Sequence, residues 1–279
     1  MITWNPRRGI PFLYTNRQYG GDGMDKREKL ALLSVMHGGN WSAIADSLRR
    51  KETPDRSVIR DAYITIYDDM YPASLRELRF PPWVLFYKGD ISLLQAPAVA
   101  VVGSREAIDY GRLAAEWVVE NLCDRYTVVS GLARGIDAAA HRTALRLGGR
   151  TIGVIGSGLG TSYPRENISL YRDIGKENLI ITEYPHDVGV RKEHFPWRNR
   201  IIAALGRHVF VIQAARRSGT MLTVNEALTL NRDIYCIPYP LGNPFGEGCN
   251  HLIAQGAMIL YKTEQLQDLC AGTCQKTKL

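Results

Sequence analysis

The chain has 279 residues, 45% of them hydrophobic and 23% charged, so it is long and apolar enough to bury a full core. Lys and Arg number 35 against 28 Asp and Glu, and the resulting net charge of +7 weakly favours an anionic partner. Five cysteines without paired spacing argue against a disulfide framework, so we expect free thiols in the cytoplasm, with no metal site and no cofactor. No apolar run is long enough for a membrane span, and no membrane association is predicted.

The first 92 residues predict two segments. Residues 1–23 lack hydrophobic periodicity, which predicts a disordered tail, and Met24 is an alternative translation start. Apolar side chains then recur at helical spacing over Leu30–Met36 and Trp41–Leu48, with Gly38-Gly39 between the two stripes. An apolar run over Trp83–Tyr87 predicts a strand. We therefore expect a small, mostly helical N-terminal domain over residues 24–92.

From residue 93 to 262, short apolar strands alternate with amphipathic helices. Strands that are apolar throughout and separated by helices predict an α/β fold, with a mostly parallel sheet covered on both faces. Right-handed crossovers make this sheet doubly wound and Rossmann-like. The predicted strands are Ala98–Val102, Thr127–Val129, Thr151–Ile155, Leu179–Thr182, His208–Ile212 and Ile234–Ile237, and the predicted helices are Tyr110–Leu122, Ile136–Leu147, Arg198–Leu205 and Thr223–Leu230. Residues 263–279 predict a C-terminal tail that starts as a helix.

The loops that follow the predicted strands share one chemical character. Because the carboxyl ends of parallel strands meet at one edge of a sheet, these loops should form a single surface. Glycine allows close approach to backbone N–H groups, hydroxyls donate hydrogen bonds, and arginine matches phosphate oxygens. The predicted phosphate-loop residues are Gly103, Ser104, Ser130, Gly131, Gly156, Ser218 and Gly219. Such a surface is broader than one nucleotide needs, which favours a polynucleotide.

Aromatic residues stand in the same loops. Tyr163, Tyr184, Phe195 and Trp197 could serve as stacking platforms for the bases of a single strand. The same rings could instead close the edge of the sheet, and for Phe195 and Trp197 beside Pro196 the two interpretations are equally supported.

Two further patterns involve charged residues at predicted helix starts. Arg198 and Arg200 are cations where the helix dipole favours anions, so an anionic partner is the better reason for them. His141 follows Asp137 by one helical turn. That pair could act as a general base, but a local hydrogen bond that fixes the helix start is favoured.

Two alternatives to polynucleotide binding stay open. The same glycine loops could hold one small nucleotide as a sensor. The loop Arg216–Thr220 with Glu226 is distantly similar to the nucleotide-cleaving lysine-decarboxylase-like family, although the fuller P-G-G-x-G-T-x-x-E pattern is missing. Neither a P-loop nor a complete dinucleotide fingerprint is present.

A chain of ordered motifs resembles the DNA-processing protein A (DprA/Smf) family. Ala100–Arg105 resembles its first motif, and Val129–Asp137 its most recognisable signature. Further similar strings are Tyr163-Pro164, Phe195-Pro196 with Arg198–Ile202, Ser218–Thr220 with Thr223, and Gly248 with His251–Ile253 and Gly256-Ala257. The resemblance covers residues 71–261. The helical start resembles the family's sterile-alpha-motif-like (SAM-like) domain more loosely.

The resemblance implies a non-enzymatic protein that binds and protects single-stranded DNA, forms a homodimer and loads the RecA recombinase in natural transformation. The implied DNA-binding residues are Arg105, Arg134, Arg165, Lys192, Arg198 and Arg200, and the implied dimer interface includes His251, Leu252 and Leu260. Tyr239, Gly206 and Gln213 depart from the Gly, Ser and Glu that the family usually has. After residue 261 too little chain follows for the winged helix with which many relatives end.

Overall fold

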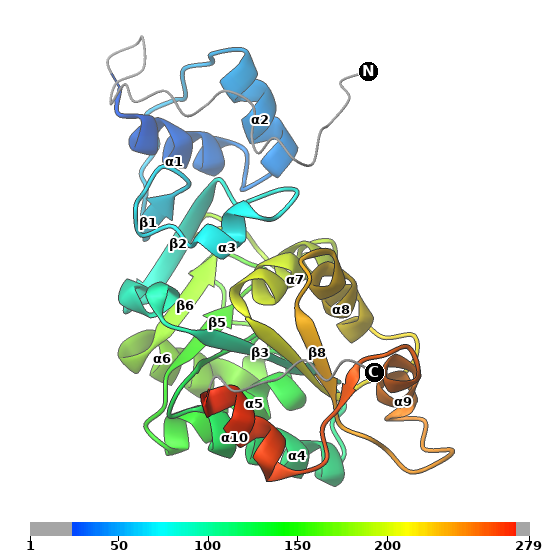
Figure 1. The fold of residues 1–279 in the computed structure, drawn as a ribbon. Coiled ribbons are helices and arrows are strands. Elements are labelled where there is room, and N and C mark those ends of the chain that lie inside the picture. Colours follow the sequence, from blue (N-terminus) through cyan, green and yellow to red (C-terminus); the bar gives the residue numbers. More distant parts are fainter. Residues whose placement is uncertain (1–23, 272–279) are drawn as a thin grey trace.

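The computed structural model describes residues 24–271, and the tails predicted for residues 1–23 and 272–279 lie outside this range. One sheet runs through the molecule in the strand order β1-β2-β6-β5-β4-β3-β7-β8-β9 (Figure 1). The strands are β1 (Ala62–Thr65), β2 (Val84–Gly89), β3 (Ala98–Gly103), β4 (Thr127–Ser130), β5 (Thr151–Val154), β6 (Leu179–Thr182), β7 (His208–Gln213), β8 (Asp233–Cys236) and β9 (Met258–Ile259). Strands β3 to β9 pair in parallel, whereas β1 and β2 add to the β6 edge in antiparallel orientation.

Helices cover both faces of the sheet, as the fully apolar strands predicted. Figure 1 places α7 and α8 on one face and α4, α5 and α10 on the other. The α-helices are α1 (Lys26–Met36), α2 (Trp41–Arg49), α3 (Ala73–Arg76), α4 (Asp109–Leu122), α5 (Ile136–Arg146), α6 (Ile168–Glu177), α7 (His194–Leu205), α8 (Thr220–Thr229), α9 (Glu247–Ala254) and α10 (Thr263–Ala271), with 3₁₀ turns at η1 (Ile91–Gln95) and η2 (Arg165–Asn167). Between the layers, Val99, Val101, Val209 and Phe210 have no exposed surface. The predicted Rossmann-like α/β fold is thereby confirmed.

The N-terminal region contributes strands as well as helices. Asp25 caps α1 and Asn40 caps α2 through their side-chain oxygens, which explains where the two helices start. The predicted strand at residues 83–87 is β2, but it pairs with β6 of the main sheet. The predicted boundary between residues 92 and 93 therefore separates β1 and β2 from the sheet that they extend. The division into domains stays a prediction.

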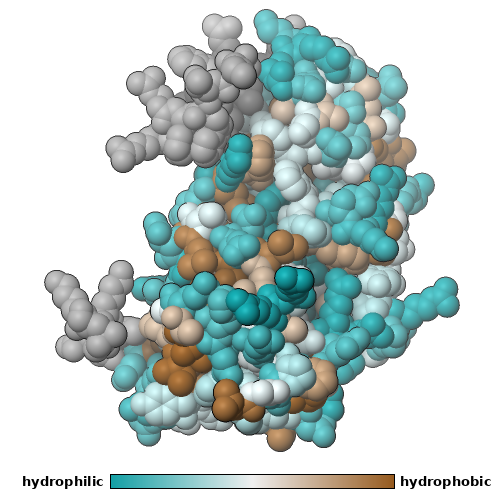
Figure 2. All heavy atoms as spheres, turned by 90° about the vertical axis from the view of Figure 1, so that its right-hand side faces the viewer, coloured by the Kyte–Doolittle hydropathy of each residue, from teal (hydrophilic) through white to brown (hydrophobic). Residues whose placement is uncertain are grey.

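The surface carries its hydrophobic side chains in separate patches. Figure 2 shows the face formed by the right-hand side of Figure 1, where brown residues alternate with teal ones. Among the helices of residues 24–271, none combines the length and the apolar character that a membrane span requires. In the same part of the chain, no three His, Cys, Asp or Glu side chains gather as metal ligands would.

Candidate nucleic-acid interface

The strand order changes direction at β3. From β3 the chain adds β4, β5 and β6 on one side, then returns to place β7 on the other. In doubly wound sheets, ligands bind outside the carboxyl ends of the two strands at such a switch point. A cavity of about 600 Å³ lies there, bounded by residues 102–106 at the end of β3 and just after it, 218–223 around the start of α8, and 192–199 at the start of α7. We call it the switch-point cavity.

Close backbone packing shapes this cavity. Gly135 before α5 has a positive φ of 74°, and a Cβ on it would lie 2.2 Å from the carbonyl oxygen of Ser104. Glycine is therefore required where the loops after β3 and β4 touch. The buried Gln213 holds the first loop as well, because its Oε1 accepts from the N–H of Ile108 and its Nε2 donates to the carbonyl of Glu106. An ionised glutamate has no hydrogen to donate and could not make the second bond. The amide of Gln at this position therefore fixes the loop at both ends.

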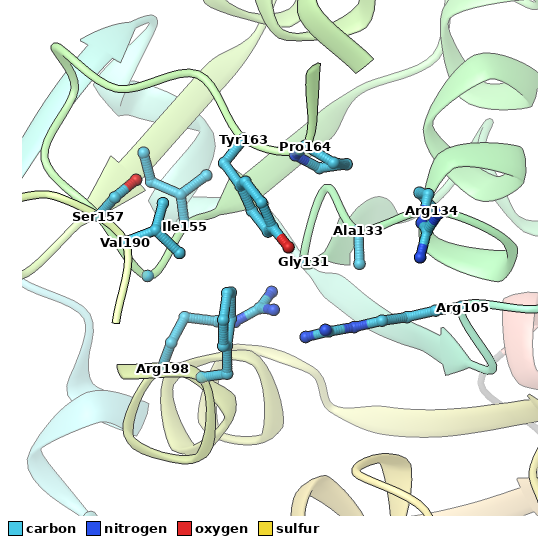
Figure 3. A pocket seen from close by; sticks show the side chains of 12 residues that line it. Arg105, Gly131, Ala133, Arg134, Ile155, Ser157, Tyr163, Pro164, Val190 and Arg198 are labelled. Atoms are coloured by element: carbon cyan, nitrogen blue, oxygen red, sulfur yellow. The ribbon is translucent and has the colours of Figure 1, made fainter. Parts of the chain in front are cut away.

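Cations from separate elements line the switch-point cavity and the smaller pocket that opens beside it. The guanidinium of Arg105 lies over the ring of Phe195, 4.7 Å from its centroid. Exposed Lys192 lines the main cavity, and exposed Arg134 lines the smaller pocket. In Figure 3 the guanidinium groups of Arg105 and Arg198 point toward one another, while Tyr163 reaches into the same space from the other side. Two cations that face each other across open space favour an anion between them.

Arg198 belongs to a buried electrostatic cluster. Its side chain is 4% exposed, and its Nη1 donates to the carbonyl of Val154 at 2.9 Å. Burial lowers the pKa of Arg198 to about 10, and the nearby carboxylate of Asp137 opposes that shift. Burial also raises the pKa of Asp137, while the charge of Arg198 opposes this change. Arg198 therefore stays protonated at neutral pH, held in place by protein groups and open to the cavity on one side.

Three of the predicted site residues lie outside the linings of the switch-point cavity and the smaller pocket, and their roles stay predictions. Arg200 is 3% exposed and paired with the buried Glu183, and its guanidinium lies 4.5 Å from the ring centre of Trp197. It borders neither the switch-point cavity nor the smaller pocket. Ser130 is buried and donates to the carbonyl of Val101. Arg165 is exposed but also lies outside both linings. We leave these three out of the DNA-contacting set that we propose.

Acids inside the protein, and not only an anionic partner, account for the cations at the start of α7. The positive charges of Arg198 and Arg200 are unfavourable at the N-terminus of α7. The negative charges of Asp137 and Glu183, inside the protein, offset that cost. His141 does not bond to Asp137: its Nδ1 lies 2.7 Å from the hydroxyl of Thr151. Because that hydroxyl donates to the carbonyl of Val128, the His141 Nδ1 is the donor between the two side chains.

The aromatic residues divide between two roles. Tyr163 is 46% exposed and lies 5.9 Å from Phe195, and both rings line the switch-point cavity. Tyr184 is buried and stacked on His194 at 3.9 Å. Trp197 packs against Phe80, with the two ring centres 5.6 Å apart. Phe195 and Tyr163 are therefore positioned for a base in the switch-point cavity, whereas Tyr184 and Trp197 lie on the other side of α7.

The predicted dimer residues lie on and beside α9 and β9. Leu252 and Leu260 are 5% and 1% exposed, so their side chains belong to the core, and His251 is half-buried. Ile259 and Tyr261 expose 39% and 63% of their surface on the outer edge of the sheet. A partner subunit would meet these exposed side chains and His251 rather than the two leucines.

The doubly wound sheet and its cation-lined switch point define the chain as a Rossmann-like α/β protein. Residues 62–271 match the family model of DNA recombination-mediator protein A, and the chain belongs to that family. It is 45% identical over 196 residues to the DNA processing protein DprA of Streptococcus pneumoniae, with 70% of each chain covered. It is 37% identical over 205 residues to that of Bacillus subtilis, covering 73% of this chain and 69% of the relative.

Solved structures agree with this assignment. The DprA structure from Streptococcus pneumoniae superposes with a TM-score of 0.75 at 35% identity, covering 86% of this chain and 92% of that one. The DprA structure from Helicobacter pylori superposes with a TM-score of 0.70 at 28% identity, covering 77% and 99%. The Helicobacter pylori protein is described as having a unique single-stranded DNA binding mode. The resemblance noted in the sequence motifs is confirmed.

Proposed function

We propose that the protein binds single-stranded DNA in the switch-point cavity. The observation that carries this proposal is the pair of facing guanidinium groups of Arg105 and Arg198, with Lys192 and Arg134 beside them and the rings of Phe195 and Tyr163 in the same space. Phosphates would sit between the cations, and a base would stack on a ring. Phosphate contacts carry no sequence information and stacking is tolerant of any base, so sequence preference should be small.

We further propose that the bound strand is handed to a RecA-type recombinase by a homodimer, without catalysis. The family's description as a recombination mediator supports the transfer step. Exposed apolar residues beside β9 support the dimer. The non-enzymatic role is consistent with the arrangement of one candidate acid–base pair: His141 bonds to Thr151 and not to Asp137, so this pair does not form a general base.

Fluorescence anisotropy tests the proposal directly. Labelled oligo(dT) is titrated with protein at low and moderate salt, with duplex DNA and AMP as competitors. We expect tight, salt-sensitive binding that neither competitor displaces.

Arg105→Glu and Lys192→Glu should each weaken binding by at least about tenfold, because each places an anion among phosphates. The matched control is Arg146→Glu, at the opposite end of α5 and paired with Glu120. Displacement by AMP would favour the nucleotide-sensor alternative.

A further inference from the structure

A second cavity, of about 550 Å³, lies at the same edge of the sheet on the other side of α7. Its rings come from two distant parts of the chain. His37 and Trp41 belong to the N-terminal helix pair, and Tyr184, His194 and Trp197 follow β6 or belong to α7. We call this space the aromatic cavity.

The start of α7 is the wall between the two cavities. Lys192, Phe195 and Arg198 line the switch-point cavity, whereas Arg191, His194 and Trp197 line the aromatic cavity. This alternation follows from the helical turn, which sends neighbouring residues to opposite sides. A DNA strand that leaves the switch-point cavity across the first turn of α7 would therefore reach the aromatic cavity next.

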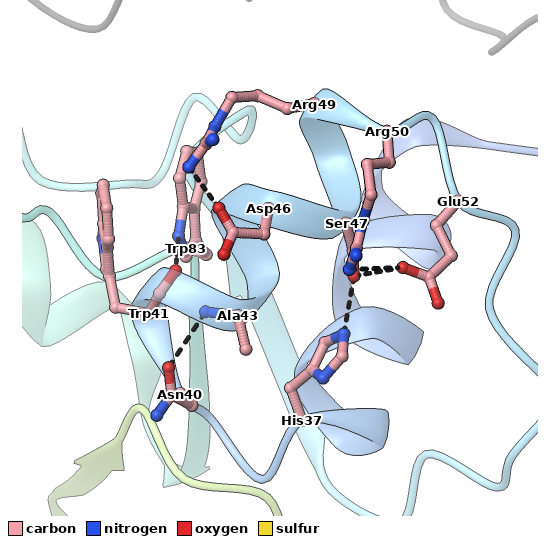
Figure 4. Close-up of polar contacts among 10 residues, drawn as sticks. All are labelled: His37, Asn40, Trp41, Ala43, Asp46, Ser47, Arg49, Arg50, Glu52 and Trp83. Carbon is pink, nitrogen blue, oxygen red and sulfur yellow. Dashed lines mark hydrogen bonds and ion pairs between the residues drawn. The ribbon is translucent and has the colours of Figure 1, made fainter. Parts of the chain in front are cut away.

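The N-terminal side of the aromatic cavity is held rigidly. Gly39 fits against the chain after β6 so closely that a Cβ on it would lie 2.7 Å from the carbonyl of Glu183. The indole of Trp41 donates to the carbonyl of Pro81. The indole of Trp83 donates to the carbonyl of Trp41 (Figure 4). Trp41 and Trp83 are also stacked, with their ring centres 5.1 Å apart. The cavity is thus preformed, and a ligand would bind without ordering its walls.

The chemistry of the aromatic cavity suits bases better than phosphates. Five of its lining side chains are aromatic or imidazole rings. Tyr184 and His194 are stacked on each other and buried, so the half-buried rings of His37, Trp41 and Trp197 are the ones that a base could reach. The lining of the cavity carries one arginine, Arg191, against the two acids Asp187 and Glu193, and Asp187 pairs with Arg60 outside the lining. Burial also lowers the pKa of His194, which keeps that ring neutral. A stacking surface without excess positive charge favours the planar, uncharged part of a nucleotide.

We infer that the aromatic cavity binds bases of the same single strand whose phosphates lie in the switch-point cavity, so that the N-terminal helix pair is part of the DNA site. This inference rests on the proposed function. It extends the strand's path across α7 and predicts a site longer than the switch-point cavity alone provides.

The test combines a cavity-filling variant with photocrosslinking. Gly189 lines the aromatic cavity, a Cβ on it meets nothing within 4 Å, and its φ lies outside the positive region, so Gly189→Glu should fold. Binding is measured with a ladder of oligo(dT) lengths. For long oligonucleotides, Gly189→Glu should lose about tenfold in affinity, the scale of one lost stacking contact. For the shortest oligonucleotide that binds, the affinity of Gly189→Glu should equal that of the wild-type protein. Arg146→Glu, a larger charge change at a distant site, is the control.

Oligonucleotides that carry 5-iododeoxyuridine at each position in turn locate the bases directly. We expect crosslinks to Trp41 or Trp197 from positions next to those that react with Phe195 or Tyr163, and their loss in Gly189→Glu. Crosslinks confined to Phe195 and Tyr163, with Gly189→Glu equal to wild type at every length, would overturn this inference and leave the proposed function standing. Failure of every length to bind at low salt would overturn both.

Discussion

The guanidinium of Arg198 lies directly on the backbone of Gly131, where a Cβ would come within 1.6 Å of its Nη1. The same Cβ would lie 2.6 Å from the carboxylate of Asp137. The glycine of the most recognisable family motif therefore makes room for a buried charge cluster. The cluster in turn holds Arg198 at the floor of the switch-point cavity.

Replacing Gly131 should damage that cluster. Gly131→Ala must displace Arg198 or Asp137, and neither can move freely because both are buried. We expect a loss of about 1–3 kcal/mol in the free energy of unfolding, the usual cost of overpacking, together with weaker oligo(dT) binding. Urea denaturation measures the first effect. Gly219→Ala is the stability control, since a Cβ there meets nothing within 4 Å. Equal losses in the two variants would contradict this explanation.

Removing the Arg198 charge should expose its dependence on Asp137. Arg198→Met leaves a carboxylate buried without its nearest cation, which should cost about 3 kcal/mol in stability. Adding Asp137→Asn removes the stranded charge, so the double variant should regain much of that loss. DNA affinity should stay low in both, because the cation facing Arg105 is gone. Thermal denaturation and oligo(dT) titration of the three proteins separate the two effects. Restored DNA binding in the double variant would show that Arg198 acts only through folding.

Arg200 should behave differently from Arg198. Because Arg200 pairs with the buried Glu183, outside the linings of the switch-point cavity and the smaller pocket, Arg200→Met should lower stability by about 3 kcal/mol. Its effect on the affinity of the folded protein for oligo(dT) should stay below about twofold, within the range of changes outside a binding site. Binding below the unfolding temperature provides the measurement. A tenfold loss of affinity with stability unchanged would return Arg200 to the DNA-contacting set.

The contrast between these two arginines marks what the sequence could and could not predict. Apolar runs at regular spacing predicted strands β3 to β8, because a strand buried on both faces leaves a local signal. The loops at the carboxyl ends followed from topology. Which of the two buried arginines lines the switch-point cavity could not be predicted, because that depends on acids such as Glu183, 17 residues from Arg200 in the sequence. The pairing of β2 with β6 is likewise non-local, and α6 and α9 were not predicted at all.

The salt dependence of the DNA binding constant should report how many phosphates the protein contacts. The logarithm of the binding constant for a single strand falls with the logarithm of salt concentration by about 0.7 per phosphate neutralised. Lys192 is exposed and lines the switch-point cavity, so Lys192→Ala should make the slope shallower by about 0.7. Arg146→Ala should leave the slope unchanged. Anisotropy titrations at several salt concentrations give both values. A parallel shift in affinity at constant slope would mean that Lys192 contacts no phosphate.

The buried imidazole of His141 should make the protein sensitive to acid. Burial, helped by the positive charge of Arg198, lowers its pKa to about 3, while the backbone of Ser130 opposes the shift. The unfolded chain takes up a proton at this residue near its ordinary pKa of 6.5, but the native protein does not until about pH 3. The free energy of unfolding contributed by neutral His141 is therefore intact above pH 6.5. As pH falls below that value it should be lost at up to about 1.4 kcal/mol per pH unit.

His141→Asn isolates this contribution. The amide nitrogen of Asn can replace Nδ1 as donor to Thr151, and the side chain does not titrate. Urea denaturation at steps between neutral pH and about pH 4.5, within the window in which only the unfolded state gains the proton, gives the slope for each protein. We expect a shallower slope in the variant, since the other titrating groups are common to both. A constant offset between two parallel curves would instead mean that His141 is protonated equally in the folded and unfolded states.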